Sequence, residues 1–127
     1  MLSLKEMFMQ QYEYAYIRIH KILVESVEVL KDISINYYHY SILFRNAQTT
    51  FNADTRNGLQ KEDYEAGAIR AFISQYEKAY DLPKSKRKKY LDEIALLNYL
   101  GSHSWELVSV IDFERNEREY YFKRLIG

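Results

Sequence analysis

Apolar and aromatic residues alternate with polar ones in three segments of the chain. In the first segment, Tyr12, Tyr14 and Tyr16 recur at a period of two and would share one face of a strand. Two later segments are also rich in β-branched and aromatic residues, and a polar run of four separates them. We therefore predict core strands at about 12–19, 105–113 and 118–126, the last two joined as an antiparallel hairpin.

Two other segments show helical periodicity. Between Leu59 and Tyr80, apolar side chains follow the i, i+3, i+4, i+7 spacing of one helix face. A second helix is predicted from about Lys84 to Leu100, after a connector that contains Pro83. Gly101 follows this helix and is the residue we expect at its left-handed cap.

The region between the first strand and the first helix is ambiguous. In residues 21–33 Leu23, Val27 and Leu30 share a helical face, although the many valines would also suit a strand, and we favour a helix. Residues 34–44 are assigned to a strand on composition, although they also fit a helical stripe. Residues 47–58 read as a polar loop that ends in an Asn-Gly turn signal.

These elements predict an α+β fold in one domain over residues 1–127. We expect an antiparallel sheet of three to four strands packed against two main helices, with a β-hairpin at the C-terminal end. The first strand and the hairpin should belong to the same sheet. A small open sheet leaves edges that invite pairing, which favours a homo-oligomer.

Composition narrows the function classes only slightly. The charges balance at 18 against 18, so there is no global field to attract nucleic acid or an anionic membrane. Cysteine is absent, and neither a signal peptide nor an apolar run long enough to span a bilayer is present, so we expect a cytoplasmic protein without membrane contact. The 13 tyrosines combine apolar rings with polar hydroxyls, which suits both packing and binding surfaces.

The C-terminal part resembles a small bacterial family of unknown function. Its typical signature, LNxLGxxGWELVSV followed by YFFKR, is similar to residues 97–110 and 120–124 here, and its opening strand is similar to residues 12–17. The resemblance implies a strand, helix, strand, strand core and no chemistry. Residues 21–83 would be an insertion, or the whole chain a distant relative. One departure is Ser104, which stands where the family has glycine and would be strained if φ there is positive.

No catalytic, metal or cofactor motif emerges, so we favour a non-enzymatic protein without a cofactor. The three histidines, His20, His39 and His103, lack the short spacing of metal ligands. The four glycines form no phosphate-binding loop. The carboxylates of Asp92 and Glu93 are expected on a solvated face rather than in an acid–base pair.

The candidate binding residues are mainly cations. Five of them crowd the start of the second predicted helix, where a helix N-terminus could help to hold a phosphate or an acidic partner, although a solvated basic turn is the commoner outcome. His103, beside Ser102 and Ser104, is the one conceivable catalytic group, and Arg115 and Arg118 could clasp an anionic ligand. The full set is Lys84, Lys86, Arg87, Lys88, Lys89, His103, Arg115 and Arg118.

The function predicted from sequence is a binding or interaction module with a protein or small anionic partner. One alternative is a small-ligand sequestering protein of phage or mobile-element origin, in which tyrosines and arginines hold a nucleotide-like molecule at a subunit interface. The other alternative is nucleic-acid binding through Lys84–Lys89, which has only Tyr90 nearby for stacking and is not favoured.

Overall fold

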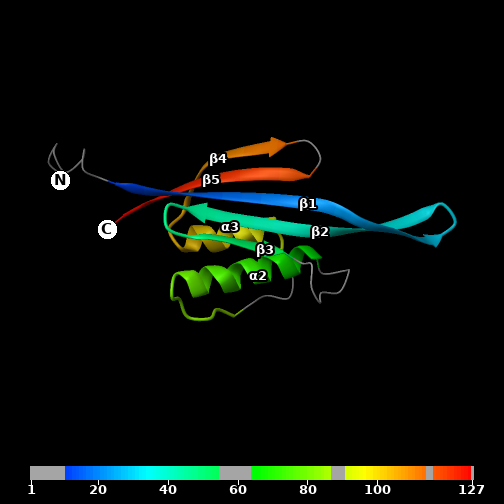
Figure 1. Ribbon diagram of the computed structural model, residues 1–127, viewed down its shortest axis with the longest axis horizontal. Coiled ribbons are helices and arrows are strands. Elements are labelled where there is room, and N and C mark those ends of the chain that lie inside the picture. The colour runs from blue at the N-terminus through cyan, green and yellow to red at the C-terminus, as the bar shows by residue number, and fades with distance from the viewer. Residues whose placement is uncertain (1–10, 55–63, 87–90, 114–115, 127) are drawn as a thin grey trace.

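The computed structural model describes residues 11–54, 64–86, 91–113 and 116–126. Within them lie five strands and two helices (Figure 1). The elements are β1 (Tyr12–Leu30), β2 (Ile33–Asn46), β3 (Thr50–Asp54), α2 (Tyr64–Ala79), α3 (Glu93–Ser102), β4 (Glu106–Phe113) and β5 (Glu117–Leu125).

The strands form one antiparallel sheet in the order β3-β2-β1-β5-β4. Both helices pack on the same face of this sheet (Figure 1). The first strand and the C-terminal hairpin are joined directly, because β1 pairs with β5 from Tyr12 to His20. The α+β class, the two helices and the C-terminal hairpin are therefore confirmed, but the sheet has five strands rather than three or four.

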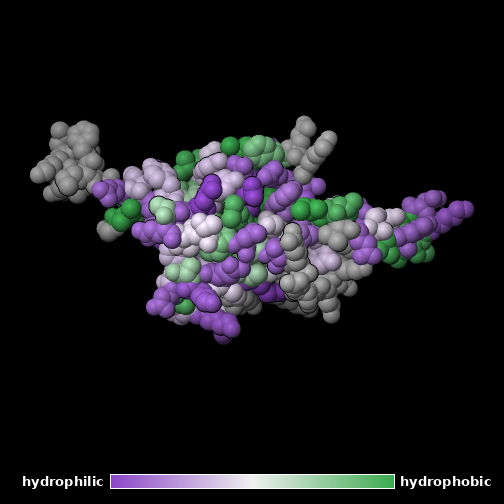
Figure 2. Space-filling view, viewed as in Figure 1, coloured by the Kyte–Doolittle hydropathy of each residue, from purple (hydrophilic) through white to green (hydrophobic). Residues whose placement is uncertain are grey.

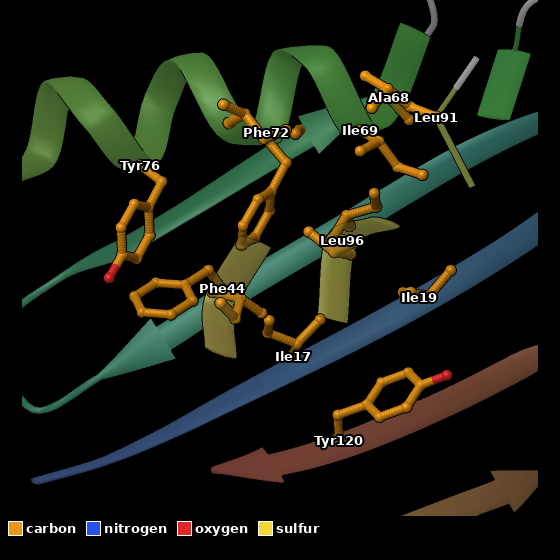
Figure 3. Close-up of a cluster of buried hydrophobic side chains, with 14 of the residues drawn as sticks. Ile17, Ile19, Phe44, Ala68, Ile69, Phe72, Tyr76, Leu91, Leu96 and Tyr120 are labelled. Carbon is orange, nitrogen blue, oxygen red and sulfur yellow. The ribbon is translucent and has the colours of Figure 1, made fainter. Parts of the chain in front are cut away.

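The core lies between the helices and the sheet. Strand alternation sends Ala15, Ile17 and Ile19 of β1 inward, while their neighbours point to the other face. Phe44 of β2 is fully buried and packs edge-on against Phe72 and Tyr76 of α2 (Figure 3). This alternation explains why one face of the sheet is apolar and covered by helices.

The helix predicted for residues 21–33 is wrong. This segment continues β1, which pairs with β2 from Ala15 to Leu30, and the chain turns back at Lys31 and Asp32. Its β-branched side chains suit cross-strand packing, and the paired strand supplies the hydrogen bonds that decide between helix and strand. The strand predicted for 34–44 is confirmed within β2.

Two other boundaries also differ from the prediction. Residues 50–54 form β3 instead of a loop, because Phe51 and Ala53 pack on the core beside β2. The second helix begins at Glu93 rather than Lys84. The backbone N–H and hydroxyl of Ser85 donate to the buried carboxylate of Glu77, and Asp92 caps α3 by accepting from the Ala95 N–H at 2.8 Å.

The left-handed residue after α3 is Ser104, with φ of 71°, and not Gly101, which lies inside the helix. The Trp105 N–H donates to the carbonyl of Leu100, and the Ser104 N–H donates to that of Gly101. These bonds define a Schellman motif, in which the second residue after the cap packs against the last turn.

Among the described residues, no helix is long and apolar enough to cross a membrane.

Candidate functional site

The face of the sheet opposite the helices carries a row of tyrosines. Tyr12, Tyr14 and Tyr16 of β1 share this face with Arg18 and His20, as the period of two predicts. Tyr14 is 64 % exposed and Tyr12 is 37 % exposed. We call this surface, together with Tyr121, Lys123 and Arg45 on the flanking strands, the tyrosine face.

Cations lie over the rings of the tyrosine face. The Arg45 guanidinium lies 5.2 Å from the centroid of the Tyr16 ring, and the Lys123 ammonium lies 4.7 Å from that of Tyr12. Tyr16 also contacts Tyr121 at a centroid distance of 5.2 Å. These contacts hold the rings of Tyr12 and Tyr16 in place on the sheet.

The charges of the tyrosine face are mixed. Arg18 lies 3.8 Å from the carboxylate of Glu117, and the Tyr121 hydroxyl donates to Glu119 at 2.9 Å, which raises the pKa of Tyr121. Within the described residues neither Arg45 nor Lys123 forms an ion pair. Two cations on this face are thus available to a partner.

A polar cavity of about 240 Å³ lies on the other side of the sheet, beside the first turns of α2 and α3. Its walls come from both helices and from four strands. The lining residues are Ile19, Lys21, Tyr40, Glu65, Glu93, Asp112, Asn116, Glu117 and Arg118.

Glu93 organises the cavity wall. It accepts a hydrogen bond from the Arg118 guanidinium at 2.8 Å and another from the Tyr120 hydroxyl. Burial, followed by this bond to Glu93, raises the pKa of Tyr120 to about 12. Arg118 also lies 3.6 Å from Asp112. Arg118 therefore shares its charge with two carboxylates, and Glu93 is not the solvated residue that the sequence suggested.

Two further groups in the cavity have raised pKa values. Burial raises the pKa of Tyr40 to about 12, with smaller contributions from Glu65 and Glu93. Burial also raises the pKa of the Glu65 carboxyl, to which the charges of Glu93 and Asp92 add. The lining carries four carboxylates against two cations, so the cavity favours positive over negative ligands.

The predicted basic cluster does not join either site. Lys84 and Lys86 are exposed in the connector between the helices, and they precede α3 by several residues instead of starting it. Arg87, Lys88, Lys89 and Arg115 lie outside the described residues. Of the predicted cations within the described residues, only Arg118 lines the cavity.

His103 is a packing residue at the C-cap of α3. Its ring contacts Tyr99 at a centroid distance of 4.7 Å and Tyr76 at 5.4 Å. The neighbouring Ser102 hydroxyl donates to the Tyr99 carbonyl at 2.6 Å. This pair therefore shows no nucleophile–base geometry, which requires the hydroxyl to face the imidazole.

In the described parts of the chain, no group of three or more His, Asp or Glu side chains is arranged to hold a metal ion. The sequence pattern found the tyrosine row but missed the cavity. Glu65, Glu93 and Tyr40 are far apart along the chain, and only the packing of α2 and α3 on the sheet brings them together.

Comparison with protein-family models, with curated proteins and with solved structures finds no match to this chain. The similarity of its C-terminal part to the small bacterial family stays a sequence prediction.

Proposed function

We propose that this protein is a non-enzymatic interaction module that binds a protein segment on its tyrosine face. The observation that carries the proposal is the row of tyrosine rings, in which Lys123 lies over the exposed Tyr12 and Arg45 over the half-buried Tyr16. Tyrosine and arginine are the residues that contribute most often to protein-binding hot spots. A rigid sheet supports the rings, so little side-chain entropy is lost on binding.

The charges of this face favour an acidic protein segment over a nucleic acid. A polynucleotide needs a track of cations along its backbone, whereas here Arg18 is paired with Glu117 and Glu119 lies beside Tyr121. Lys84 and Lys86 cannot extend the track, because they follow α2 on the side of the sheet that the helices cover. The two cations and the aromatic rings of this face are complementary to a peptide that carries a few carboxylates among apolar side chains.

The test uses random-peptide phage display with the wild-type protein as the target. The affinities of the selected peptides are then measured for wild type, for Tyr16→Ser/Tyr121→Ser and for the control Lys84→Ser/Lys86→Ser. We expect acidic peptides that lose about tenfold or more in affinity, or about 1.4 kcal/mol, in the tyrosine variant alone.

Three outcomes contradict this proposal. The display could enrich no binder, or the selected peptides could bind the tyrosine variant as well as wild type. A labelled thymidine oligonucleotide, measured by fluorescence anisotropy on the same proteins, provides the third. If it binds wild type in a salt-sensitive way and loses affinity in the tyrosine variant, single-stranded nucleic acid is the better assignment.

The alternative function, binding of an anionic nucleotide-like ligand in the cavity, has less support than protein binding on the tyrosine face. Such a ligand would have to displace Glu93 and Asp112 from Arg118. A thermal-shift screen tests this alternative directly, since a tight ligand raises the melting temperature by mass action. A large shift with a nucleotide, abolished in Arg118→Gln, would favour the cavity over the tyrosine face.

A further inference from the structure

The hairpin of β1 and β2 extends beyond the rest of the sheet. Within the described residues, β5 pairs with β1 as far as His20, and β3 pairs with β2 between Ser41 and Arg45. Residues 21–30 and 33–40 thus form a two-stranded ribbon that projects from the body (Figure 1). We call this ribbon the arm. A two-stranded ribbon by itself is marginally stable in water, so its surface chemistry matters.

The two faces of the arm differ in polarity. Residues directly opposite each other in an antiparallel pair lie on the same face. The face that continues the tyrosine face carries the apolar pairs Val27–Ile35 and Leu30–Ile33 toward the tip, the pair Glu25–Tyr37 before them, and Ile22 opposite His39 at the base. The face on the helix side carries the polar pairs Ser26–Asn36 and Glu28–Ser34 toward the tip and the pair Leu23–Tyr38 at the base, and the Ser26 hydroxyl donates to Asn36 at 2.7 Å.

The apolar face of the arm is uncovered. Leu30 is 65 % exposed and Ile33 is 54 % exposed, while Ile22 and Ile35 are 41 % and 45 % exposed. Figure 2 shows apolar side chains gathered along the arm, well away from the body. Contiguous apolar surface of this kind on a soluble fold marks an interaction site.

Residues 1–10 and 55–63, which lie outside the described residues, are each too short to cover the outer arm. Leu30 lies 18 residues along β1 from Tyr12, or about 60 Å, whereas residues 1–10 span at most about 36 Å when fully extended. Residues 55–63 are tied to β3 and α2 at their two ends, so they reach out about 17 Å. Ile33 lies about 26 Å beyond Ser41, the partner of Asp54 at the end of β3.

We infer that the arm's apolar face is covered by the arm of a second copy of this chain. The apolar residues of this face lie at its base, in Ile22, and toward its tip, in the pairs Val27–Ile35 and Leu30–Ile33, with Glu25 between the two groups. Under a two-fold axis near Val27 the base of one arm faces the tip of the other. The exposed tip residues of one arm then pack over Ile22 of the partner, and Val27 and Ile35 meet near the axis. Isologous contacts of this kind close a dimer, which is the commonest form of protein assembly.

This arrangement leaves the tyrosine face free. With the axis near Val27, each arm tip reaches only to the base of the other arm, so Tyr12, Tyr14 and Tyr16 remain open. The dimer and the proposed protein-binding site therefore do not compete, and each can be tested separately.

The size of the contact sets the expected strength. Two ribbons about 30 Å long and about 10 Å wide bury on the order of 1,000 Å² in total, which is at the lower end for specific complexes. We expect a dimer that dissociates in the micromolar range, with the apolar stripe supplying most of its free energy of association.

The experiment measures mass by analytical ultracentrifugation over about three decades of micromolar concentration. Wild type, with a chain mass of 15.3 kDa, should approach twice that mass as the concentration rises. Ile33→Lys/Ile35→Lys should remain a monomer throughout. The matched control, Ser34→Lys/Asn36→Lys, adds the same charge to the polar face of the same strand and should dimerise as wild type does. Circular dichroism melts of all three proteins check the fold.

Either of two results would overturn the inference. One is a wild-type protein that stays monomeric at the highest concentration. The other is an apolar-face variant that folds and dimerises as wild type does, which would place any interface elsewhere. The chain has no cysteine, so Val27→Cys gives a second readout. Face-to-face strands lie about 10 Å apart, which is too far for a direct disulfide, so the thiols are joined with a short bis-maleimide. A copy-to-copy cross-link supports arm stacking, while its absence in a concentrated dimer contradicts the placement of the axis.

Discussion

Both helices end on a non-glycine residue in the left-handed conformation. Asp81 after α2 has φ of 52°, and Ser104 after α3 has φ of 71°. Each occupies the Schellman position that glycine usually takes, because the N–H groups of Leu82 and Trp105 donate back to Glu77 and Leu100. A side chain at this position costs about 1 kcal/mol relative to glycine.

Ser104→Gly should therefore raise the free energy of unfolding by about 0.5–1 kcal/mol, because glycine relieves the left-handed strain. The control is Ser102→Gly, two residues earlier in the same turn. It should lower stability by a similar amount, because it places glycine in the helix and removes the bond to the Tyr99 carbonyl. Urea denaturation measures both, and equal effects of the two changes would contradict the assignment of strain to Ser104.

Tyr76 joins α2 to the start of β4 through a buried hydrogen bond. Its side chain is fully buried, and its hydroxyl accepts from the Trp105 indole N–H at 2.8 Å. Tyr76→Phe keeps the ring but leaves that N–H without its partner, so we expect a loss of about 1–3 kcal/mol in urea denaturation. A matched change, Tyr80→Phe, removes a partly buried bond to Asn46 and should cost less. A smaller loss in Tyr76→Phe than in Tyr80→Phe would contradict this ranking.

Tyr120 should make the fold sensitive to alkali. Its pKa is raised from 10.0 to about 12, so between these values the folded state holds a proton that the unfolded state has released. The stability that depends on this proton is complete below pH 10 and is lost as the pH rises toward 12.

Tyr120→Phe should reduce the slope of stability against pH in this range. Glu93→Gln should act in the same direction, because the bond to Glu93 is one of the causes of the raised pKa. The free energy of unfolding measured at several alkaline pH values gives the slope. If wild type and Tyr120→Phe lose stability in parallel, the prediction is wrong.

At the scale of elements, the arm can be separated from the body. Among the described residues, each strand of the arm beyond Lys21 and Tyr40 pairs with the other strand alone, so the described core does not include the outer arm. Replacing residues 24–37 by Asn-Gly would close the hairpin directly after the opposed pair Leu23–Tyr38 with a favoured two-residue turn.

This shortened protein should unfold within about 1 kcal/mol of wild type, since the change removes none of the core residues that the described side chains form. A thermal melt measures the effect at a concentration where wild type is monomeric. If the arm formed part of the folded core instead, the shortened protein would melt far below wild type. It should also remain monomeric at the concentrations where wild type dimerises, as the inference about the arm requires.

At the scale of the whole molecule, the strand order leaves β4 as an apolar edge. All eight of its residues are exposed, and Val108 and Val110 are 55 % and 45 % exposed. Figure 2 shows apolar side chains along this edge of the sheet. The bulge between Leu107 and Ser109 interrupts the regular ladder, which hinders pairing with another edge.

Val110→Lys should lower aggregation during heating, because a lysine on an edge strand opposes sheet-to-sheet pairing. Its cost in stability should be below about 1 kcal/mol, since the side chain is already half exposed. Light scattering during a thermal ramp measures the aggregation, and Glu106→Lys at the end of the same strand is the control for added charge. If both changes lower aggregation equally, the effect comes from the added charge and not from its position on the apolar edge, and the prediction is wrong.

The local patterns predicted what local physics controls. The tyrosine alternation in residues 12–19 identified both a strand and its polar face, and the stripe through Phe72 and Tyr76 identified α2. In both cases one face is buried and the other is exposed, so apolar and polar residues recur with the period of the strand or the helix. The hairpin at the C-terminal end was predicted for the same reason.

Tertiary contacts decided the rest. Residues 21–30 are compatible with helix and strand, and pairing with β2 settles the choice. The connector before α3 is held by Glu77 of α2, so the helix starts at Glu93 although the sequence allows an earlier start. The cavity is lined by Glu65, Glu93 and Arg118 from three elements, and their spacing along the chain does not predict that they lie close together. The sequence determined which face of each element is buried, because the spacing of apolar residues within one segment is enough to show it. Strand pairing and the cavity depend on residues from distant segments, which only the folded chain brings together.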